Sequence, residues 1–182
     1  INCFARLRGN RGAACDANEP VVRLGGKYHT PFGHTLESPH EMCPAPLPDE
    51  ASRGFIIPIG GGEDRVKERH IHRRFVDLAG GKSADIVVIP TASELETTGA
   101  DYKRIFQGLG ASAVDFLPIT KRADCDNPRY VDMLDSATGI FLTGGNQLRL
   151  STILGGTGIA QKIRRRNAAG VPVAGTSAGA SI

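Results

Sequence analysis

The stretch from Val171 to Gly179 carries the residues best suited to covalent chemistry. It is a short apolar run that leads into Gly175-Thr176-Ser177-Ala178-Gly179, a Gly-x-Ser-x-Gly pattern. Small residues two positions before and after a serine allow a sharp turn from strand to helix, which exposes the hydroxyl in a strained backbone conformation. The turn also aims the next N–H, that of Ala178, at a developing oxyanion. We therefore predict that Ser177 is a nucleophile for acyl transfer; the alternative is that it caps the following helix.

A second glycine turn, Thr143-Gly144-Gly145-Asn146-Gln147, is suited to complement this serine. It follows another apolar run, and the N–H of Gly145 can supply a second oxyanion donor. The side-chain amides of Asn146 and Gln147 can bind carboxylate or amide groups of a substrate. The alternative is a plain glycine turn in which Asn146 caps the next helix.

Other motifs argue against cofactors and metals. The run Gly60-Gly61-Gly62-Glu63-Asp64 has Arg65 where a dinucleotide-binding loop needs its third glycine, and no Walker lysine follows. His70 and His72 stand two apart in an expected helix and so point to different faces, and we expect both at the surface. The remaining histidines and a neighbouring cysteine match no metal-binding spacing; they are His29, His34, His40 and Cys43.

Strands and helices alternate from Gly54 onward, which predicts an α/β fold. Apolar runs at 55–59, 85–90, 113–117, 139–142 and 171–175 are the expected strands. The first helix is expected over 63–78, with Ile71, Phe75 and Leu78 on its buried face. The next is capped by Thr91 or Ser93, and a third by Asp126 or Asn127 with Pro128 at its first position. A last helical stretch breaks near Gly155-Gly156 and resumes to Ala169.

These elements predict three layers, a mostly parallel sheet with helices on both faces. In such sheets ligands bind beyond the carboxyl ends of the strands. The turns at 60–64, 143–147 and 176–179 each follow a strand, so we expect them to meet at one edge of the sheet.

Residues 1–53 differ from this pattern, because they are rich in proline and show no sustained periodicity. We expect an irregular, disordered leader or linker there, with a brief strand at Val21–Leu24, and the folded domain at 54–182. The chain begins with Ile1 and stops five residues after Ser177, so we expect a fragment that is truncated after the nucleophile.

Composition limits the location and the partners. The 182 residues have a net charge of +3, with 40% hydrophobic and 23% charged residues, which is ordinary for a globular protein and gives no reason to expect nucleic acid as a partner. No apolar run is long enough to span a membrane, and no signal peptide is visible. The four cysteines form no disulfide framework, so we expect a cytoplasmic protein.

Residues 55–182 resemble the S51 family of serine peptidases, which includes cyanophycinases and peptidase E. The matching stretches, in order and spacing, are Ile59–Asp64, Ile89–Ser93, Phe141–Leu150 and Ala174–Ala180. The resemblance implies a fold similar to class I glutamine amidotransferases, with serine in place of their cysteine. It implies Ser177 as nucleophile, an oxyanion hole from Ala178 and the Gly144-Gly145 turn, and Gln147 in the substrate pocket, with no metal or organic cofactor.

The activity implied is exopeptidase hydrolysis of cyanophycin, a poly-aspartate with arginine on each side chain, to β-Asp-Arg dipeptides. The family's catalytic histidine and acid follow the serine, whereas all five histidines here precede Ser177. We therefore expect this fragment by itself to be inactive. The alternatives are a peptidase E-like dipeptidase, an esterase of the α/β-hydrolase type, and a binding module of the same fold without catalysis. The expected partner is a peptide or cyanophycin polymer, and a homodimer is left open.

Overall fold

The computed structural model describes residues 22–24, 27–29, 35–36 and 52–181, and it divides the chain into two compact units, Ile1–Pro46 and Leu47–Ile182. In the first unit, β1 (Val22–Leu24), β2 (Lys27–His29) and β3 (Thr35–Leu36) pair as a small antiparallel sheet. The brief strand expected at Val21–Leu24 is present as β1. The rest of the expected leader up to residue 51 lies outside the described residues.

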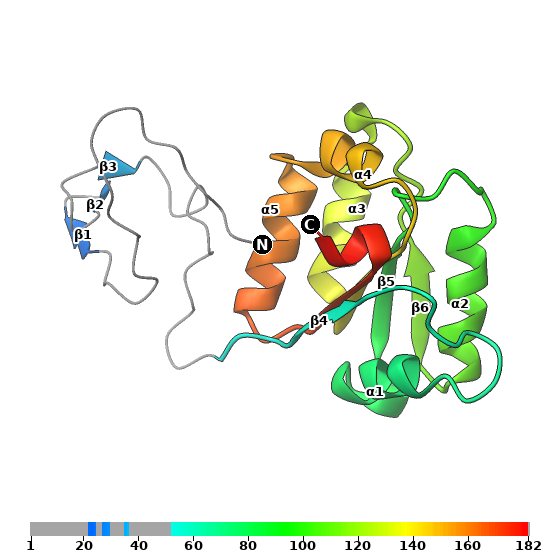
Figure 1. Cartoon of the computed structure of the whole chain (residues 1–182). Coiled ribbons are helices and arrows are strands. Elements are labelled where there is room, and N and C mark those ends of the chain that lie inside the picture. Colours follow the sequence, from blue (N-terminus) through cyan, green and yellow to red (C-terminus); the bar gives the residue numbers. More distant parts are fainter. Residues whose placement is uncertain (1–21, 25–26, 30–34, 37–51, 182) are drawn as a thin grey trace. The chain divides into compact units, whose positions relative to one another are not determined.

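The second unit is built on a five-stranded parallel sheet (Figure 1). Its order is β4-β8-β7-β5-β6, so the strand before Ser177 lies between the first and fourth strands of the domain. The α/β class and the parallel sheet are as predicted. The strands are β4 (Ile56–Ile59), β5 (Asp85–Ile89), β6 (Ala113–Phe116), β7 (Gly139–Leu142) and β8 (Val173–Thr176).

Helices cover both faces of this sheet, as predicted (Figure 1). On one face, side chains such as Ile86 and Phe141 pack with α1 (His70–Leu78) and α2 (Thr98–Gly108). On the other face, the alternate residues Val87 and Ile140 pack with three helices. These are α3 (Pro128–Ser136), α4 (Gln147–Leu154) and α5 (Gly158–Ala168). Because β5 from Ile86 onward and β7 are buried on both faces, their sequences there are continuously apolar rather than alternating.

The later helices begin and end at the capping residues and the glycine break that the sequence indicated. Asn127 is the N-cap of α3, and its side-chain oxygen accepts a hydrogen bond from the Arg129 N–H at 3.1 Å, with Pro128 in the first turn. The expected break at Gly155-Gly156 separates α4 from α5, and the Thr157 hydroxyl caps α5. Short 3₁₀ turns complete the unit at η2 (Gly81–Ser83), η3 (Arg122–Asp126) and η4 (Ser177–Ser181).

The expected starts of the first two helices are wrong. The helix expected over 63–78 begins only at His70. Arg69 has a left-handed φ of 51°, and a right-handed helix cannot extend through such a residue toward the amino terminus. Its buried face also differs: Phe75 is buried as expected, but Ile71 is 44% exposed and His72 is fully buried. Likewise α2 begins at Thr98, and the Ser93 hydroxyl shares a hydrogen bond with the Thr98 hydroxyl at 2.6 Å instead of capping a helix.

The carboxyl ends of the three adjacent strands β4, β8 and β7 lie level. Ile59 is paired with Thr176, and Leu142 with Gly175. The turns after these strands therefore meet at one edge of the sheet, as predicted. None of the helices in the described part of the chain is long and apolar enough to cross a membrane.

Candidate active site

Ser177 stands at the point where β8 ends and the η4 turn begins. Its φ of 50° lies in the left-handed region, which among the described non-glycine residues only Arg69 shares. A side chain in this region is strained, by about 1–3 kcal/mol, and such residues cluster at functional sites. The residue is exposed, whereas Thr176 and Ala178 on either side of it are buried. This is the exposed, strained turn that the sequence pattern indicated.

The two glycines of the pattern are required by close backbone contacts. A Cβ on Gly175 would lie 2.0 Å from the Gly179 carbonyl oxygen. A Cβ on Gly179 would lie 2.4 Å from the carbonyl oxygen of Leu142. Both distances are far inside van der Waals contact, so any larger residue would force the turn open. The chain can therefore fold back beneath Ser177 only because these two positions carry no side chain.

The Gly144-Gly145 turn lies beside the serine. A Cβ on Gly144 would be 3.3 Å from the Ser177 Cβ. Gly145 has a φ of 143°, and a Cβ there would lie 2.1 Å from the Ala92 carbonyl oxygen, which accepts a hydrogen bond from the Asn146 N–H at 2.7 Å. The loop after β5 therefore holds the glycine turn in place, with its backbone close to the predicted nucleophile.

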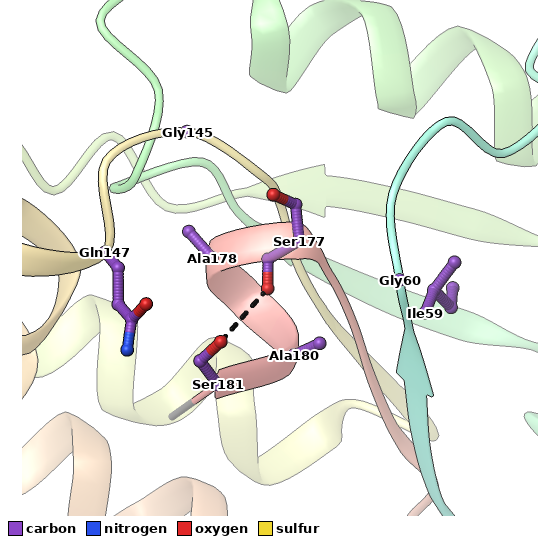
Figure 2. Close-up of a pocket in the computed structure, with 8 residues that line it drawn as sticks. All are labelled: Ile59, Gly60, Gly145, Gln147, Ser177, Ala178, Ala180 and Ser181. Atoms are coloured by element: carbon purple, nitrogen blue, oxygen red, sulfur yellow. Dashed lines mark hydrogen bonds between the residues drawn. The ribbon is translucent and has the colours of Figure 1, made fainter.

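These segments line an open cavity of about 370 Å³ (Figure 2). In Figure 2 the Ser177 hydroxyl stands at the top of the η4 turn, between the loop that carries Gly145 and the end of β4 at Gly60. Gln147 comes from the wall on the Gly145 side. The lining residues are Ile59, Gly60, Gly145, Gln147, Ser177, Ala178, Ala180 and Ser181.

Four of the five predicted site residues therefore line one cavity, and the fifth lies beside it. Asn146 is the N-cap of α4, and its side-chain oxygen accepts a hydrogen bond from the Arg149 N–H at 3.0 Å. The side-chain oxygen of Asn146 therefore caps a helix, as the alternative interpretation expected. A contact between Asn146 and substrate stays a prediction. Ser181 also lines the cavity and was not predicted as a site residue. Its hydroxyl donates to the Ser177 carbonyl oxygen at 3.4 Å. Its position four residues after Ser177 was the sequence signal that could have indicated it.

Sequence reasoning also missed Glu63, which is hydrogen-bonded to the residue directly before Ser177. Its carboxylate accepts hydrogen bonds from the Thr176 hydroxyl at 2.7 Å and from the Tyr102 hydroxyl at 2.9 Å. Burial acts to raise the pKa of Glu63, but the hydrogen bonds from Thr176 and Tyr102 help to hold it below its ordinary value. The carboxylate is therefore ionised at neutral pH. Since these partners come from β8 and α2, no local sequence pattern could have indicated them.

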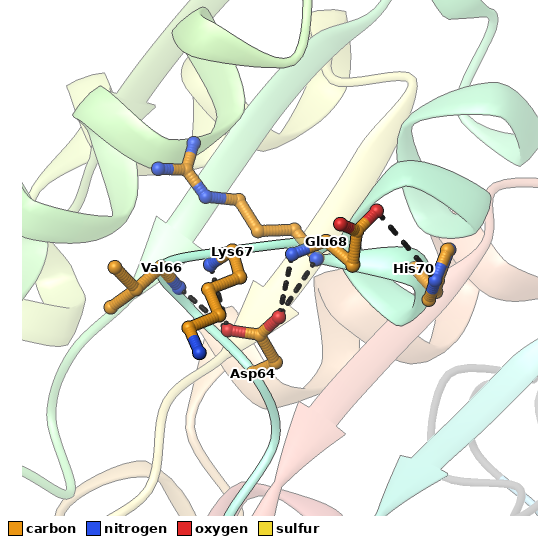
Figure 3. A network of polar contacts seen from close by, with 6 residues as sticks. Asp64, Val66, Lys67, Glu68 and His70 are labelled. Atoms are coloured by element: carbon orange, nitrogen blue, oxygen red, sulfur yellow. Dashed lines mark hydrogen bonds and ion pairs between the residues drawn. The ribbon is translucent and has the colours of Figure 1, made fainter.

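The next residue, Asp64, organises the remainder of the loop that leads to α1 (Figure 3). Its two carboxylate oxygens accept hydrogen bonds from four successive backbone N–H groups, those of residues 66 to 69, at 2.7 to 3.3 Å. These backbone donors hold the pKa of Asp64 far below its usual range. The carboxylate thereby replaces the helical hydrogen bonds that the expected earlier helix would have made.

His72 was expected at the surface, and this expectation is wrong. Its ring is fully buried among aromatic rings, with centroid distances of 5.9 Å to Tyr102 and 5.7 Å to Phe106. Neither ring nitrogen makes a hydrogen bond of ordinary distance and angle. Burial lowers the pKa of His72, and the opposing attraction of the Glu63 carboxylate does not outweigh it. By contrast, the His70 side chain is 80% exposed, as expected.

Within the described residues, no group of three or more histidine, cysteine, aspartate or glutamate side chains is placed to bind a metal. The side chains of His29, His34, His40 and Cys43 lie outside the part that the structure describes. The cavity contains a hydroxyl nucleophile candidate, glycine and alanine backbone amides, and one side-chain amide. This set suits the binding of a carbonyl group and the stabilisation of an oxyanion.

Residues 56–182 match the model of peptidase family S51. Two curated relatives are the cyanophycinases of Nostoc sp. (strain PCC 7120), 42% identical over 135 residues, and of Synechococcus elongatus, 41% identical over 132 residues. These alignments cover 73% and 71% of this chain. The chain spans only 45% and 41% of the relatives' own lengths.

Two solved structures have a similar fold. One is a peptidase from an acI-B1 actinobacterium, with a TM-score of 0.58 and 28% identity over 70% of this chain and 55% of that one. The other is described as a putative peptidase E from Listeria monocytogenes EGD-e, with a TM-score of 0.53 and 26% identity over 70% of this chain and 60% of that one. Both similarities agree with the parallel α/β architecture.

Proposed function

The chain belongs to peptidase family S51, and on that premise we propose that the full-length protein is a serine exopeptidase that cleaves cyanophycin into β-Asp-Arg dipeptides. The observation that carries the proposal is the exposed, strained Ser177 at the mouth of a cavity lined by glycine and alanine backbone. The choice of cyanophycin is supported by the relatives at 41–42% identity, which are cyanophycinases.

In the proposed reaction, the Ser177 oxygen attacks the backbone carbonyl carbon at the scissile bond and gives up its proton to a general base. The N–H groups of Ala178 and Gly145 stabilise the negative oxygen of the tetrahedral intermediate. The intermediate collapses to an acyl-enzyme as the leaving amine takes the proton, and water then releases the second product. Gln147 is proposed to orient the substrate from the cavity wall.

The general base is proposed to come from a part of the protein outside this chain. None of the eight residues that line the cavity is a histidine, aspartate or glutamate. The buried His72 is packed among aromatic rings and is not among them. A serine hydroxyl without a base is a poor nucleophile at neutral pH. We therefore propose that the 182-residue chain by itself does not turn over substrate.

The test uses the full-length parent protein with cyanophycin, and chromatography measures the dipeptides released. We expect Ser177→Ala to lower the rate by at least about a thousandfold, because removal of a nucleophile abolishes the acyl-enzyme route. Ser136→Ala, at the exposed end of α3, is the control and should release dipeptides at the parent rate. Normal release by Ser177→Ala would refute the proposal. Cleavage of N-terminal aspartyl dipeptides without cleavage of cyanophycin would instead support the peptidase E alternative.

A further inference from the structure

The Glu63 carboxylate joins two buried hydroxyls from different elements. Thr176, the residue before Ser177, is 3% exposed and donates to Oε2 at 2.7 Å. Tyr102, from α2, is 2% exposed and donates to Oε1 at 2.9 Å. Each carboxylate oxygen therefore already has a partner within the protein. Hydrogen bonds to an ionised acceptor are shorter and about twice as strong as neutral ones, so this arrangement is well suited to fix a backbone.

Glu63 also belongs to the loop that contacts the serine from the β4 side. A Cβ on Gly61, two residues before Glu63, would lie 3.4 Å from the Ser177 Cβ and 3.8 Å from its Oγ. Gly61 has a φ of 95°, a conformation that favours glycine. The loop thus comes close to the hydroxyl at Gly61 and is bonded to β8 at Thr176. The Glu63 side chain thus links the 60–62 loop to β8, two of the segments that adjoin Ser177.

Glu63 is not placed to act as a general base for Ser177. Glu63 does not line the cavity, and its oxygens accept from Thr176 and Tyr102. Ser177 is strained at φ 50°, and such a conformation persists only where the surrounding structure holds it. The hydrogen bond between Thr176 and Glu63 holds the residue that directly precedes this strained serine.

We propose that Glu63 is a positioning residue, which acts through Thr176 to hold the Ser177 hydroxyl and the 60–62 loop in the reactive arrangement. This inference rests on the proposed role of Ser177 as a nucleophile. Loss of the bond displaces the attacking oxygen and leaves Gln147, the proposed substrate-orienting residue, in place. It therefore lowers kcat more than it changes KM.

The experiment uses the full-length parent protein and four variants. Thr176→Val removes the hydroxyl but keeps the branched shape, and Thr176→Ser restores a hydroxyl. Glu63→Gln keeps one acceptor oxygen and replaces the other with a donor. Thr138→Val is the matched control: it removes a half-buried threonine hydroxyl that accepts from the Asp85 N–H at 2.8 Å, at the opposite end of the sheet.

The principal measurement is the rate at which a fluorophosphonate labels Ser177, followed by mass spectrometry. In this reaction the serine oxygen loses its proton to the general base and bonds to phosphorus as fluoride leaves, so the rate reports the nucleophile without requiring cyanophycin. We expect labelling of Thr176→Val and Glu63→Gln to slow by about ten- to a hundredfold, the range for a small misplacement of a reacting group. The labelling rate of Thr176→Ser should lie within about threefold of the parent rate. The labelling rate of Thr138→Val should lie within about twofold of it, even if this change lowers the melting temperature as much as Thr176→Val does.

Coupling between the two residues is tested with the double variant Glu63→Gln with Thr176→Val. If both changes break the same link, the double variant labels no more slowly than the slower single variant. With cyanophycin as substrate, kcat should fall in parallel with labelling, and KM should stay within about twofold.

Three results with the variants would overturn the inference. They are labelling of Thr176→Val at the parent rate, equal slowing by Thr138→Val, and additive losses in the double variant. A parent protein whose Ser177 is not labelled would overturn it as well, because there would be no nucleophile to position. A parent that is labelled but does not cleave cyanophycin would refute the proposed substrate alone, and the labelling rates would still test Glu63.

Discussion

Gly179 lies so close to Leu142 that a Cβ on the glycine would come within 2.4 Å of the leucine carbonyl oxygen. The carboxyl end of β7 therefore limits the size of the residue that follows Ser177 by two positions. This contact joins the predicted nucleophile turn to the strand whose end carries the Gly144-Gly145 turn. A change at Gly179 should consequently disturb the Ser177 turn and the Gly144-Gly145 turn together.

We expect Gly179→Ala to lower the free energy of unfolding by about 1–3 kcal/mol, the usual cost of overpacking a rigid site. The control is Gly158→Ala in the first turn of α5, where a Cβ would meet nothing within 4 Å. That change should leave the protein equally stable or up to about 1 kcal/mol more stable, because alanine favours the helix. Urea unfolding measures both variants, and equal stabilities would contradict the packing interpretation.

The left-handed backbone conformation at Ser177 predicts that a residue with a Cβ at this position lowers the stability of the fold. Ser177→Gly removes the Cβ that is strained at φ 50°, whereas Ser177→Ala keeps it. We expect the glycine variant to unfold at a higher urea concentration than the alanine variant, by about 1 kcal/mol in free energy. Both variants of the full-length protein should be inactive. A less stable glycine variant would show that the turn is not strained.

Burial of His72 predicts a pH dependence of stability. Its pKa in the folded state is lowered from the ordinary value of 6.5, so the folded protein binds fewer protons at this site than the unfolded chain. The stabilising contribution of the neutral ring is present above about pH 6.5 and is lost as the pH falls. His72→Phe should therefore lose less stability than the parent between pH 7 and pH 5.

Urea unfolding at several pH values measures this difference. The groups that face His72 with charge are Glu63, Arg65 and Arg69, and the variant keeps all three. His70→Gln, two residues away with its side chain 80% exposed in the parent, serves as the control and should follow the parent curve. A parent and a His72→Phe variant with parallel curves would show that the ring titrates normally.

Asp64 predicts a separate effect on the loop before α1. Its carboxylate accepts from the N–H groups of residues 66 to 69 through both oxygens, and Asp64→Asn can replace only one of them (Figure 3). We expect faster hydrogen exchange at these four amides in the variant. The pKa of Asp64 is lowered, so in the parent this protection is present above the usual pKa of 3.8 and is lost as the pH falls well below it.

Asp132→Asn, an exposed acid on α3, is the control for this measurement. It should leave the exchange of residues 66 to 69 unchanged at every pH. Unchanged exchange in Asp64→Asn would show that the loop is held by other contacts.

The doubly buried strands were the part of the fold best predicted from sequence. The runs at 86–89 and 139–142 are continuously apolar because helices cover both faces, and the structure places β5 and β7 there. The start of α1 was mispredicted for a local reason that sequence periodicity does not reveal. The Asp64 carboxylate takes the N–H groups that a helix would use, so the apolar spacing after residue 63 gave the wrong beginning.

The buried face of α1 depended on distant contacts. Gly139 has no side chain, and a Cβ there would lie 2.7 Å from the Ala79 Cβ and 3.1 Å from the Phe75 ring. This close approach sets the face that α1 turns toward β7, and it brings His72 into the core. For the site, the Gly-x-Ser-x-Gly pattern and the glycine turn predicted four of the cavity residues. Glu63 was missed, because its partner Thr176 lies 113 residues further along the chain.

The pairing of β4 with β8 joins the first and last strands of the parallel sheet. A ribosome synthesises a chain from its amino end, and early segments begin to fold before later ones emerge. Within this sheet, Ile56–Ile59 has no neighbouring strand until Val173–Thr176 has been made. Within the described residues, a newly made polypeptide therefore completes the turn that carries the predicted nucleophile only after the other four strands and the five α-helices have been synthesised.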